Sequence, residues 1–183
     1  MKIDFPAEGI LFDSVLLRRF TVDDLEIVHA ALNDDGIVEP ADMPFSHPPL
    51  EMVRAVIEER LPLWLEEGYA ATLGICDPGT GSLMGGGTVR KIRWDEKIGE
   101  VGYWLLPAAR GRGVATTACR ALAQYAFGLG LERIEAVTSV ANEASQRVLE
   151  RVGFTREGVL RSVALQRGGR GDVVMWSLLP GEL

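Results

Sequence analysis

Four stretches of the chain space their hydrophobic residues as amphipathic helices do. They run from Thr21 to about Asn33, from Leu50 to Glu67, from Val114 to Leu129 and from Asn142 to Gly153. Thr21 and Asp24 have the spacing of a capping box, and Asn142 is a residue type that commonly caps a helix. Pro62 predicts a kink or a break in the second helix, and Gly153 predicts the end of the fourth.

Seven other stretches have the dense or alternating apolar residues of strands. They are 15–20, 70–77, 83–93, 100–106, 133–139, 154–165 and 173–179. The turn at 78–81 joins the second and third strands as an antiparallel hairpin. Gly85, Gly86 and Gly87 lie inside a predicted strand, which indicates a bulge or a large group close to the backbone. The chain has no repeat and no internal boundary, so its 183 residues predict one domain over residues 1–183.

The segment from Glu100 to Ala115 joins a strand to a helix through two glycines. Gly111 and Gly113 leave the backbone able to take positive φ and to approach a ligand closely. The first N–H groups of the helix that follows have no partner within it, so they can bind a phosphate. The glycine spacing matches neither a dinucleotide fingerprint nor a P-loop. Taken alone, the segment fits an anion site or a tight connection equally well.

Composition and charge narrow the class of partner. The chain is 47% hydrophobic and 25% charged, as ordinary globular proteins are, and its net charge of −7 disfavours nucleic acid and favours amine-bearing partners. It has no apolar run of membrane-spanning length and no signal-peptide core at its start, so we expect a cytoplasmic protein. Cys76 and Cys119 lack metal-ligand spacing and are predicted to be buried, reduced thiols, and no metal site is predicted.

The sequence Arg110-Gly111-Arg112-Gly113-Val114-Ala115, placed after a Gly-Tyr-Trp-Leu strand, resembles the acyl-CoA pyrophosphate loop of the GNAT N-acetyltransferases, Q/R-x-x-G-x-G/A. The Glu-Val-Gly-Tyr-Trp-Leu run, Asn142-Glu143-Ala144-Ser145, Gly153-Phe154 and the closing 172–179 resemble the RimL/RimJ-like branch in particular. The resemblance covers nearly the whole chain in order. It implies an α/β (α+β) GNAT fold, in which about four helices flank a mixed, mostly antiparallel twisted sheet of six to seven strands with a splayed central pair. A homodimer is a further expectation of this family.

The resemblance also implies where acetyl-CoA binds. The backbone amides of Leu105 and Leu106 would pair with the pantetheine amides at the splay. The pyrophosphate would lie on the N–H groups of Arg110, Gly111, Arg112, Gly113, Val114 and Ala115. The two arginines would add positive charge there or would simply be solvated. Asn142 would contact the cofactor near the pantetheine as well as cap its helix.

Two residues are predicted to carry the chemistry of acetyl transfer. Ser145 is either an ordinary first-turn residue or, as in this branch, the hydroxyl beside the sulfur that protonates the leaving thiolate. Many GNAT enzymes place a tyrosine in this helix for that role, and this helix has none. Glu100 matches the central-strand glutamate that some GNAT enzymes use as a base, and the alternative is a structural carboxylate paired with an arginine. Some RimL-like enzymes carry a glutamate at the position aligned to Ala164, where this chain departs from the pattern.

The acceptor is the least specified part of the hypothesis. Glu39, Asp42 and Phe45 lie in a proline-rich loop that walls the acceptor pocket in GNAT relatives, unless it is only a surface connection. Trp104 is the fourth predicted acceptor residue, since strand alternation places it on the face of Glu100. Branch resemblance favours the N-terminal α-amine of a protein or peptide. A polyamine, amino acid or aminoglycoside is the alternative, and a CoA-binding module without turnover is the rival from another class.

The free energy of deprotonation separates the acceptor classes. An α-amine with a pKa near ~8 is about one-tenth neutral at pH 7, so producing the neutral nucleophile costs roughly 1.4 kcal/mol. A lysine amine with a pKa near ~10.4 costs roughly 4.6 kcal/mol. An N-terminal acceptor therefore demands much less of a catalytic base.

Overall fold

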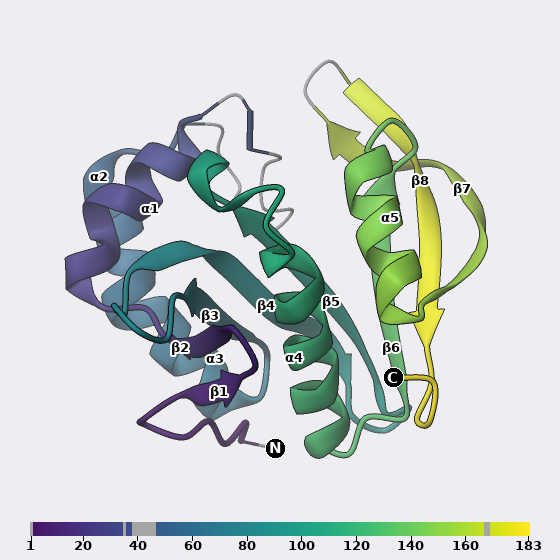
Figure 1. Cartoon of the computed structure of the whole chain (residues 1–183), viewed down its shortest axis with the longest axis horizontal. Helices are drawn as coiled ribbons and strands as arrows, with labels where there is room; N and C mark the ends of the chain where they lie inside the picture. The colour runs from purple at the N-terminus through teal and green to yellow at the C-terminus, as the bar shows by residue number, and fades with distance from the viewer. Residues whose placement is uncertain (1, 35, 38–46, 167–168) are drawn as a thin grey trace.

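One eight-stranded sheet forms the centre of the molecule in the computed structural model, which describes residues 2–34, 36–37, 47–166 and 169–183. The strand order is β1-β2-β3-β4-β5-β6-β8-β7, with β5 and β6 parallel and the other neighbours antiparallel (Figure 1). The strands are β1 (Ile10–Phe12), β2 (Val15–Arg19), β3 (Ala71–Cys76), β4 (Leu83–Arg93), β5 (Ile98–Leu105), β6 (Arg133–Ser139), β7 (Thr155–Gln166) and β8 (Gly169–Leu178). The GNAT fold predicted from the sequence is confirmed, with one more strand than the six to seven expected.

The helices cover the sheet in two groups. They are α1 (Leu25–Leu32), α2 (Leu50–Ala55), α3 (Leu61–Glu67), α4 (Val114–Gly128) and α5 (Glu143–Val152), with short helical turns at Val22–Asp24, Val56–Arg60 and Pro107–Ala109. Figure 1 shows α4 over β4 and β5 and α5 over β6 and β8 on the near face. α1 and α2 form a second hydrophobic cluster with Cys76 and Leu83. None of the helices in the described ranges combines the length and apolar character that crossing a membrane requires.

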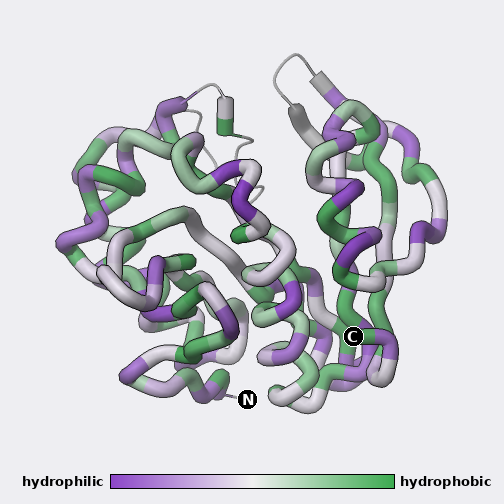
Figure 2. The backbone as a smooth tube through the Cα atoms, in the orientation of Figure 1, coloured by the Kyte–Doolittle hydropathy of each residue, from purple (hydrophilic) through white to green (hydrophobic). Residues whose placement is uncertain are grey.

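The hydrophobic pattern explains how these layers pack. In Figure 2 the tube along β6 and β8 is mostly green, whereas α5 alternates between green and purple along its length. Leu149 and Val152 of α5 are buried, and its charged residues lie on the solvent side. Gly153 takes φ of 112° and ends this helix as predicted, because a left-handed residue is least strained when it is glycine.

The predicted helix over 50–67 is irregular. α2 passes through a π-helical turn at Val56–Arg60 into α3, and Pro62, which has no N–H to donate, directly follows this turn. The irregularity that Pro62 predicts is therefore present as a π-helical turn rather than as a break. The proline is accommodated by this wider turn just before it.

The three consecutive glycines of β4 allow two bulky side chains to lie against the backbone. A Cβ on Gly86 would stand 2.5 Å from Nε1 of Trp104, and one on Gly87 would stand 2.6 Å from Cδ1 of Leu122. The register between β3 and β4 also shifts at Ile75 and Cys76. Both expectations for this stretch, a bulge and a close neighbour, are confirmed, and the neighbours are the protein's own indole and leucine.

β5 and β6 are paired only at their starts. Their register joins Ile98 to Arg133, Gly99 to Ile134 and Glu100 to Glu135, and the described residues beyond these form no further β5–β6 pairs. The splayed central pair implied by the resemblance is therefore present. The opening faces α5 on one side and the loop before α4 on the other (Figure 1).

Candidate functional site

The loop from Arg110 to Gly113 turns the chain out of β5 and into α4. Gly111 and Gly113 have φ of 73° and 82°, in the left-handed region that favours glycine. Gly113 is the N-cap of α4, and a Cβ added at either glycine would meet no protein atom within 4 Å. The glycines are thus required by the backbone conformation, and the space beside them is open.

The amides of this turn are available to a ligand. Thr117 donates the first regular bond of α4, to the carbonyl of Gly113 at 3.1 Å. Within the ranges that the structure describes, the N–H groups of residues 111–116 donate no hydrogen bond to a protein atom. The N–H of Arg110 donates to the carbonyl of Pro107 at 3.2 Å, so the prediction that it binds the pyrophosphate is wrong. Unpaired amides at a helix N-terminus carry the positive end of the helix dipole and suit a phosphate. This part of the structure fits a pyrophosphate.

The two arginines of the loop behave differently. Arg110 donates from Nε to the carbonyl of Leu105 at 3.1 Å and from Nη2 to the carbonyl of Gly36 at 3.2 Å. It therefore ties the end of β5 to the segment after α1. Arg112 is exposed. Its charge acts on nearby Asp77, whose pKa is lowered mainly by hydrogen bonds from Thr80 and to a smaller extent by Arg112. Arg112 is the better placed of the two to meet an anion at the loop.

The prediction that Leu106 offers a bare amide is wrong. Its N–H donates to the carbonyl of Met84 at 2.9 Å. Successive amides of a strand point to opposite edges, so Leu105 and Leu106 cannot both face the splay. The amides on the β6 edge of β5 are those of Tyr103 and Leu105, beyond the last pair at Glu100. They present the open edge that a pantetheine chain can join as an added strand.

The N-terminus of α5 forms the other wall of the splay. Asn142 Oδ1 accepts a hydrogen bond from the amide of Ser145 at 3.1 Å, so the predicted helix cap is confirmed. The Oγ atom of Ser145 lies 2.9 Å from the hydroxyl of Tyr103 on β5. Burial raises the pKa of Tyr103, which therefore stays protonated at neutral pH. The role of Asn142 toward the cofactor stays a prediction.

Sequence reasoning missed Tyr103. The signal was available in the alternation of β5, because a residue next to Trp104 must point to the opposite face of the sheet. That face is the one covered by α4 and α5, and Ser145 lies in the first turn of α5. The periodicity of the sequence could not show that Tyr103 would contact Ser145, which lies 42 positions further along the chain.

Glu100 lies on the other face of β5 and is held by two cations. Its side chain is 6% exposed, its Oε1 accepts from Arg90 Nη2 at 2.7 Å, and its Oε2 accepts from Lys91 Nζ at 2.8 Å. The pairing with an arginine, which the sequence left open as the alternative to a base, is therefore present. Trp104 shares this face and packs against Gly86. Glu39, Asp42 and Phe45 lie outside the described residues.

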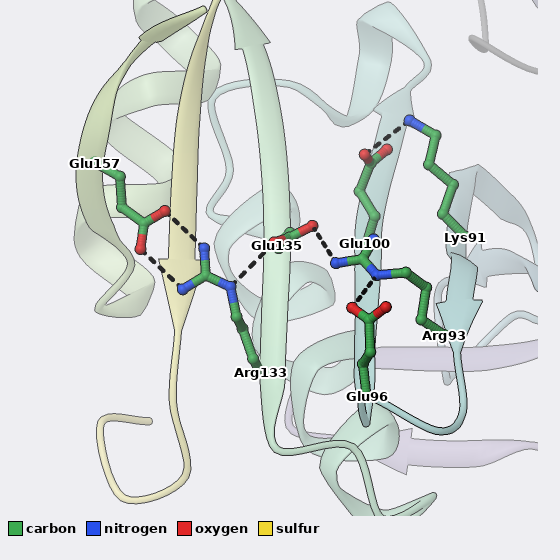
Figure 3. A network of polar contacts seen from close by, with 7 residues as sticks. All are labelled: Lys91, Arg93, Glu96, Glu100, Arg133, Glu135 and Glu157. Carbon is green, nitrogen blue, oxygen red and sulfur yellow. Dashed lines mark hydrogen bonds and ion pairs between the residues drawn. The ribbon is translucent and has the colours of Figure 1, made fainter.

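A wider ion-pair network surrounds the closed end of the splay (Figure 3). It runs from Arg93 on β4 through Glu135 and Arg133 on β6 to Glu157 on β7. The hydrogen bond from Arg133 lowers the pKa of Glu157 to about 2. These ion pairs cross the strands where β5 and β6 are still hydrogen-bonded, so they stabilise the closed end of the splay.

These features would suit an acyl-CoA, with an open strand edge for pantetheine followed by a helix N-terminus for the pyrophosphate. The model of the acetyltransferase (GNAT) domain family matches residues 14–155. The chain therefore belongs to the GNAT acetyltransferase family, whose acyl donor is acetyl-CoA. The family and the cofactor predicted from the sequence are confirmed.

Similar proteins of known name indicate the branch of the family to which this chain is related. YdaF of Bacillus subtilis, whose name carries a provisional ribosomal N-acetyltransferase activity, is 39% identical over 56% of each chain. YoaA of the same species, an uncharacterized N-acetyltransferase, is 29% identical over 91% of this chain and 94% of its own. The ribosomal-protein-serine acetyltransferase of Escherichia coli is 31% identical over 52% of this chain and 54% of its own. The matches to the two ribosomal relatives thus span about half their length, and these names support the RimJ/RimL-like branch.

Solved structures agree with the fold. A provisionally named acetyltransferase superposes with a TM-score of 0.77 at 27% identity, over 96% of this chain and 98% of its own. The spermidine N-acetyltransferase of Vibrio cholerae, in complex with CoA and spermine, superposes with a TM-score of 0.77 at 20% identity, over 92% and 97%. At the lower identity the likeness shows the fold alone.

Proposed function

We propose that the protein transfers the acetyl group of acetyl-CoA to the N-terminal α-amine of a protein or peptide. The observation that carries the proposal is the run of unpaired amides at 111–116, which lies beside the open edge of β5. The ribosomal names of two relatives favour a protein N-terminus as acceptor. We further propose one domain over residues 1–183 and a cytoplasmic location, and the homodimer stays a prediction.

The chain's own residues divide the work of binding and proton transfer. The amides of Tyr103 and Leu105 hold the pantetheine, and those from Gly111 to Ala115 hold the pyrophosphate. Bound acetyl-CoA supplies the thioester that the amine attacks. Ser145 donates a proton to the departing sulfur and regains one from solvent water, which takes the proton that the attacking nitrogen loses, so the proton count balances.

Direct attack by the amine is favoured over an acyl-enzyme. Burial raises the pKa of Cys76 to about 11 and the pKa of Cys119 to about 12. Both thiols are fully buried, and a thiol rather than a thiolate is a poor nucleophile. The chain therefore reacts through a complex that holds the acyl donor and the amine together.

The contacts of Glu100 support a positioning role rather than that of the base. Both of its oxygens are engaged by cations, and protonation would remove the negative charge that Arg90 and Lys91 contact. An α-amine needs only roughly 1.4 kcal/mol to lose its proton at pH 7, so solvent water can take it. An α-amine acceptor is thus consistent with a Glu100 carboxylate that is engaged by cations and is not free to act as a base.

A small polyamine is the second candidate acceptor. The net charge of −7 attracts cations, and the spermidine N-acetyltransferase of Vibrio cholerae shares the fold. Polyamines, however, present amines of higher pKa, which makes a strong base more necessary. The engaged Glu100 weighs against them.

An acceptor panel tests the proposal. Release of CoA thiol is measured with a peptide that has a free N-terminus but no lysine, its N-terminally blocked lysine-containing counterpart, and spermidine. The proposal predicts release with the first peptide and acetylation of its α-amine by mass spectrometry. Faster release with spermidine would establish the second candidate. Tight CoA binding without any acceptor-dependent release would identify a binding module.

A further inference from the structure

A side-chain hydrogen bond connects the two walls of the splay. The hydroxyl of Tyr103 comes from β5, and the hydroxyl of Ser145 comes from the first turn of α5, with 2.9 Å between their oxygens. The backbone of Ser145 is already fixed by the cap at Asn142. Its side chain is therefore fixed by Tyr103, and the two groups lie beside the open edge that would take the pantetheine.

The direction of this bond decides what Ser145 can do. A hydroxyl has one proton to donate and two lone pairs to accept with. If Ser145 donated to Tyr103, it would have no proton for another partner. If Tyr103 donates, the lone pair of Ser145 is occupied and the serine proton is directed elsewhere.

We propose that Tyr103 is a positioning residue, which donates its hydroxyl proton to Ser145 Oγ and so aims the serine proton at the sulfur of CoA. This inference rests on the proposed acetyl transfer. The sequence of α5 has no tyrosine. Tyr103 on β5 would assist protonation of the sulfur instead, by orienting Ser145. No proton leaves Tyr103 in the step, because Ser145 gives its own proton to the sulfur and regains one from solvent water, which takes the proton that the amine loses.

The surroundings of Tyr103 suit a fixed donor. Its hydroxyl is part-buried, and burial raises its pKa, so the phenol keeps its proton throughout the working pH range. A phenol that stays protonated is a constant hydrogen-bond donor to Ser145 Oγ, and with this donor in place the serine proton points away from Tyr103.

The first experiment measures binding without turnover. Affinities for CoA and for desulfo-CoA, which lacks the thiol, are compared by calorimetry in the wild type, Tyr103→Phe and Ser145→Ala. We expect the wild type to prefer CoA and both variants to lose that preference while keeping their affinity for desulfo-CoA. Tyr125→Phe is the matched control, since Tyr125 is also a partly buried tyrosine of raised pKa, but its hydroxyl donates to the carbonyl of Asp4.

The second experiment measures turnover as a double-mutant cycle. Tyr103→Phe should lower kcat about tenfold with KM for acetyl-CoA unchanged, and adding it to Ser145→Ala should lower kcat no further. Wild-type kcat and wild-type preference for CoA in Tyr103→Phe would overturn the inference. So would multiplying effects in the double variant, because they would show that the two hydroxyls act separately.

The two proposals fail in different ways. If no amine is acetylated, yet the preference for CoA over desulfo-CoA depends on Tyr103, the proposed function is wrong and the positioning of Ser145 stands. If the wild type acetylates amines and Tyr103→Phe matches it in both assays, the function stands and the positioning role is wrong.

Discussion

Replacing Gly113 by alanine tests the anion site with a control built into the same chain. Gly113 has φ of 82° and no protein atom within 4 Å of an added Cβ. Gly130, after the other end of α4, has φ of 90° and the same open space. The two glycines therefore share backbone strain and lack of crowding, and they differ in that Gly113 precedes the unpaired amides.

The cost in stability follows from the backbone alone. A left-handed conformation costs a non-glycine residue about 1–2 kcal/mol. Alanine also has less unfolded-state entropy to lose, which offsets about 0.4–1 kcal/mol. Gly113→Ala and Gly130→Ala should each lower the free energy of unfolding by about 1 kcal/mol, or about 2–4 °C in Tm at this chain length.

The effect on ligand binding should differ between the two variants. The methyl group at position 113 would occupy the space beside the amides of 111–116, so we expect CoA affinity to fall at least about tenfold, which is about 1.4 kcal/mol. Gly130→Ala should keep wild-type affinity. Urea unfolding gives the stabilities, and calorimetric titration with CoA gives the affinities. Equal CoA affinity in the two variants would refute the assignment of the loop.

Three further substitutions test other parts of the structure. Asp24→Asn should cost about 3 kcal/mol in urea unfolding at pH 7, because Asp24 is 4% exposed and pairs with Arg18 at 2.7 Å. Burial of Asp24 raises its pKa, but the hydrogen bonds from Arg18 and Thr21 outweigh this effect and lower the pKa below its ordinary value. The stabilisation is therefore present above the ordinary pKa of 3.8 and is lost at lower pH. If the free energy of unfolding of Asp24→Asn fell with acid as steeply as that of the wild type, this reasoning would be contradicted. Glu100→Gln should lose stability but keep the shape of the pH–rate profile, whereas a flattened rise with pH would restore Glu100 as the base. Gly86→Ala should displace the indole that packs on it and cost about 1–3 kcal/mol in thermal unfolding, and an unchanged Tm would show that the indole moves freely.

The sequence was most informative where local chemistry decides the structure. The glycines at 111 and 113, the cap at Asn142 and the end of α5 at Gly153 each depend on residues a few positions apart. These features were predicted correctly from residue type and spacing. The resemblance then supplied the splay, which no local pattern indicates.

The errors and omissions arose where partners are distant or strands are irregular. β1 spans three residues, too few for a periodic signal. The Leu106 amide was misassigned because the sequence does not show which edge of β5 pairs with β4. The pairing of Glu100 with Lys91 depends on a register shift in β4 and on φ of 49° at Lys91, neither of which residue type predicts.

The most direct test of the central claim is an amide NMR titration of the protein with CoA. The account predicts that the largest shift changes fall on Gly113, Val114 and Ala115 at the N-terminus of α4 and on Tyr103 and Leu105 at the edge of β5. Shift changes that leave these five amides unmoved at saturating CoA, or that gather on another part of the sheet, would contradict it.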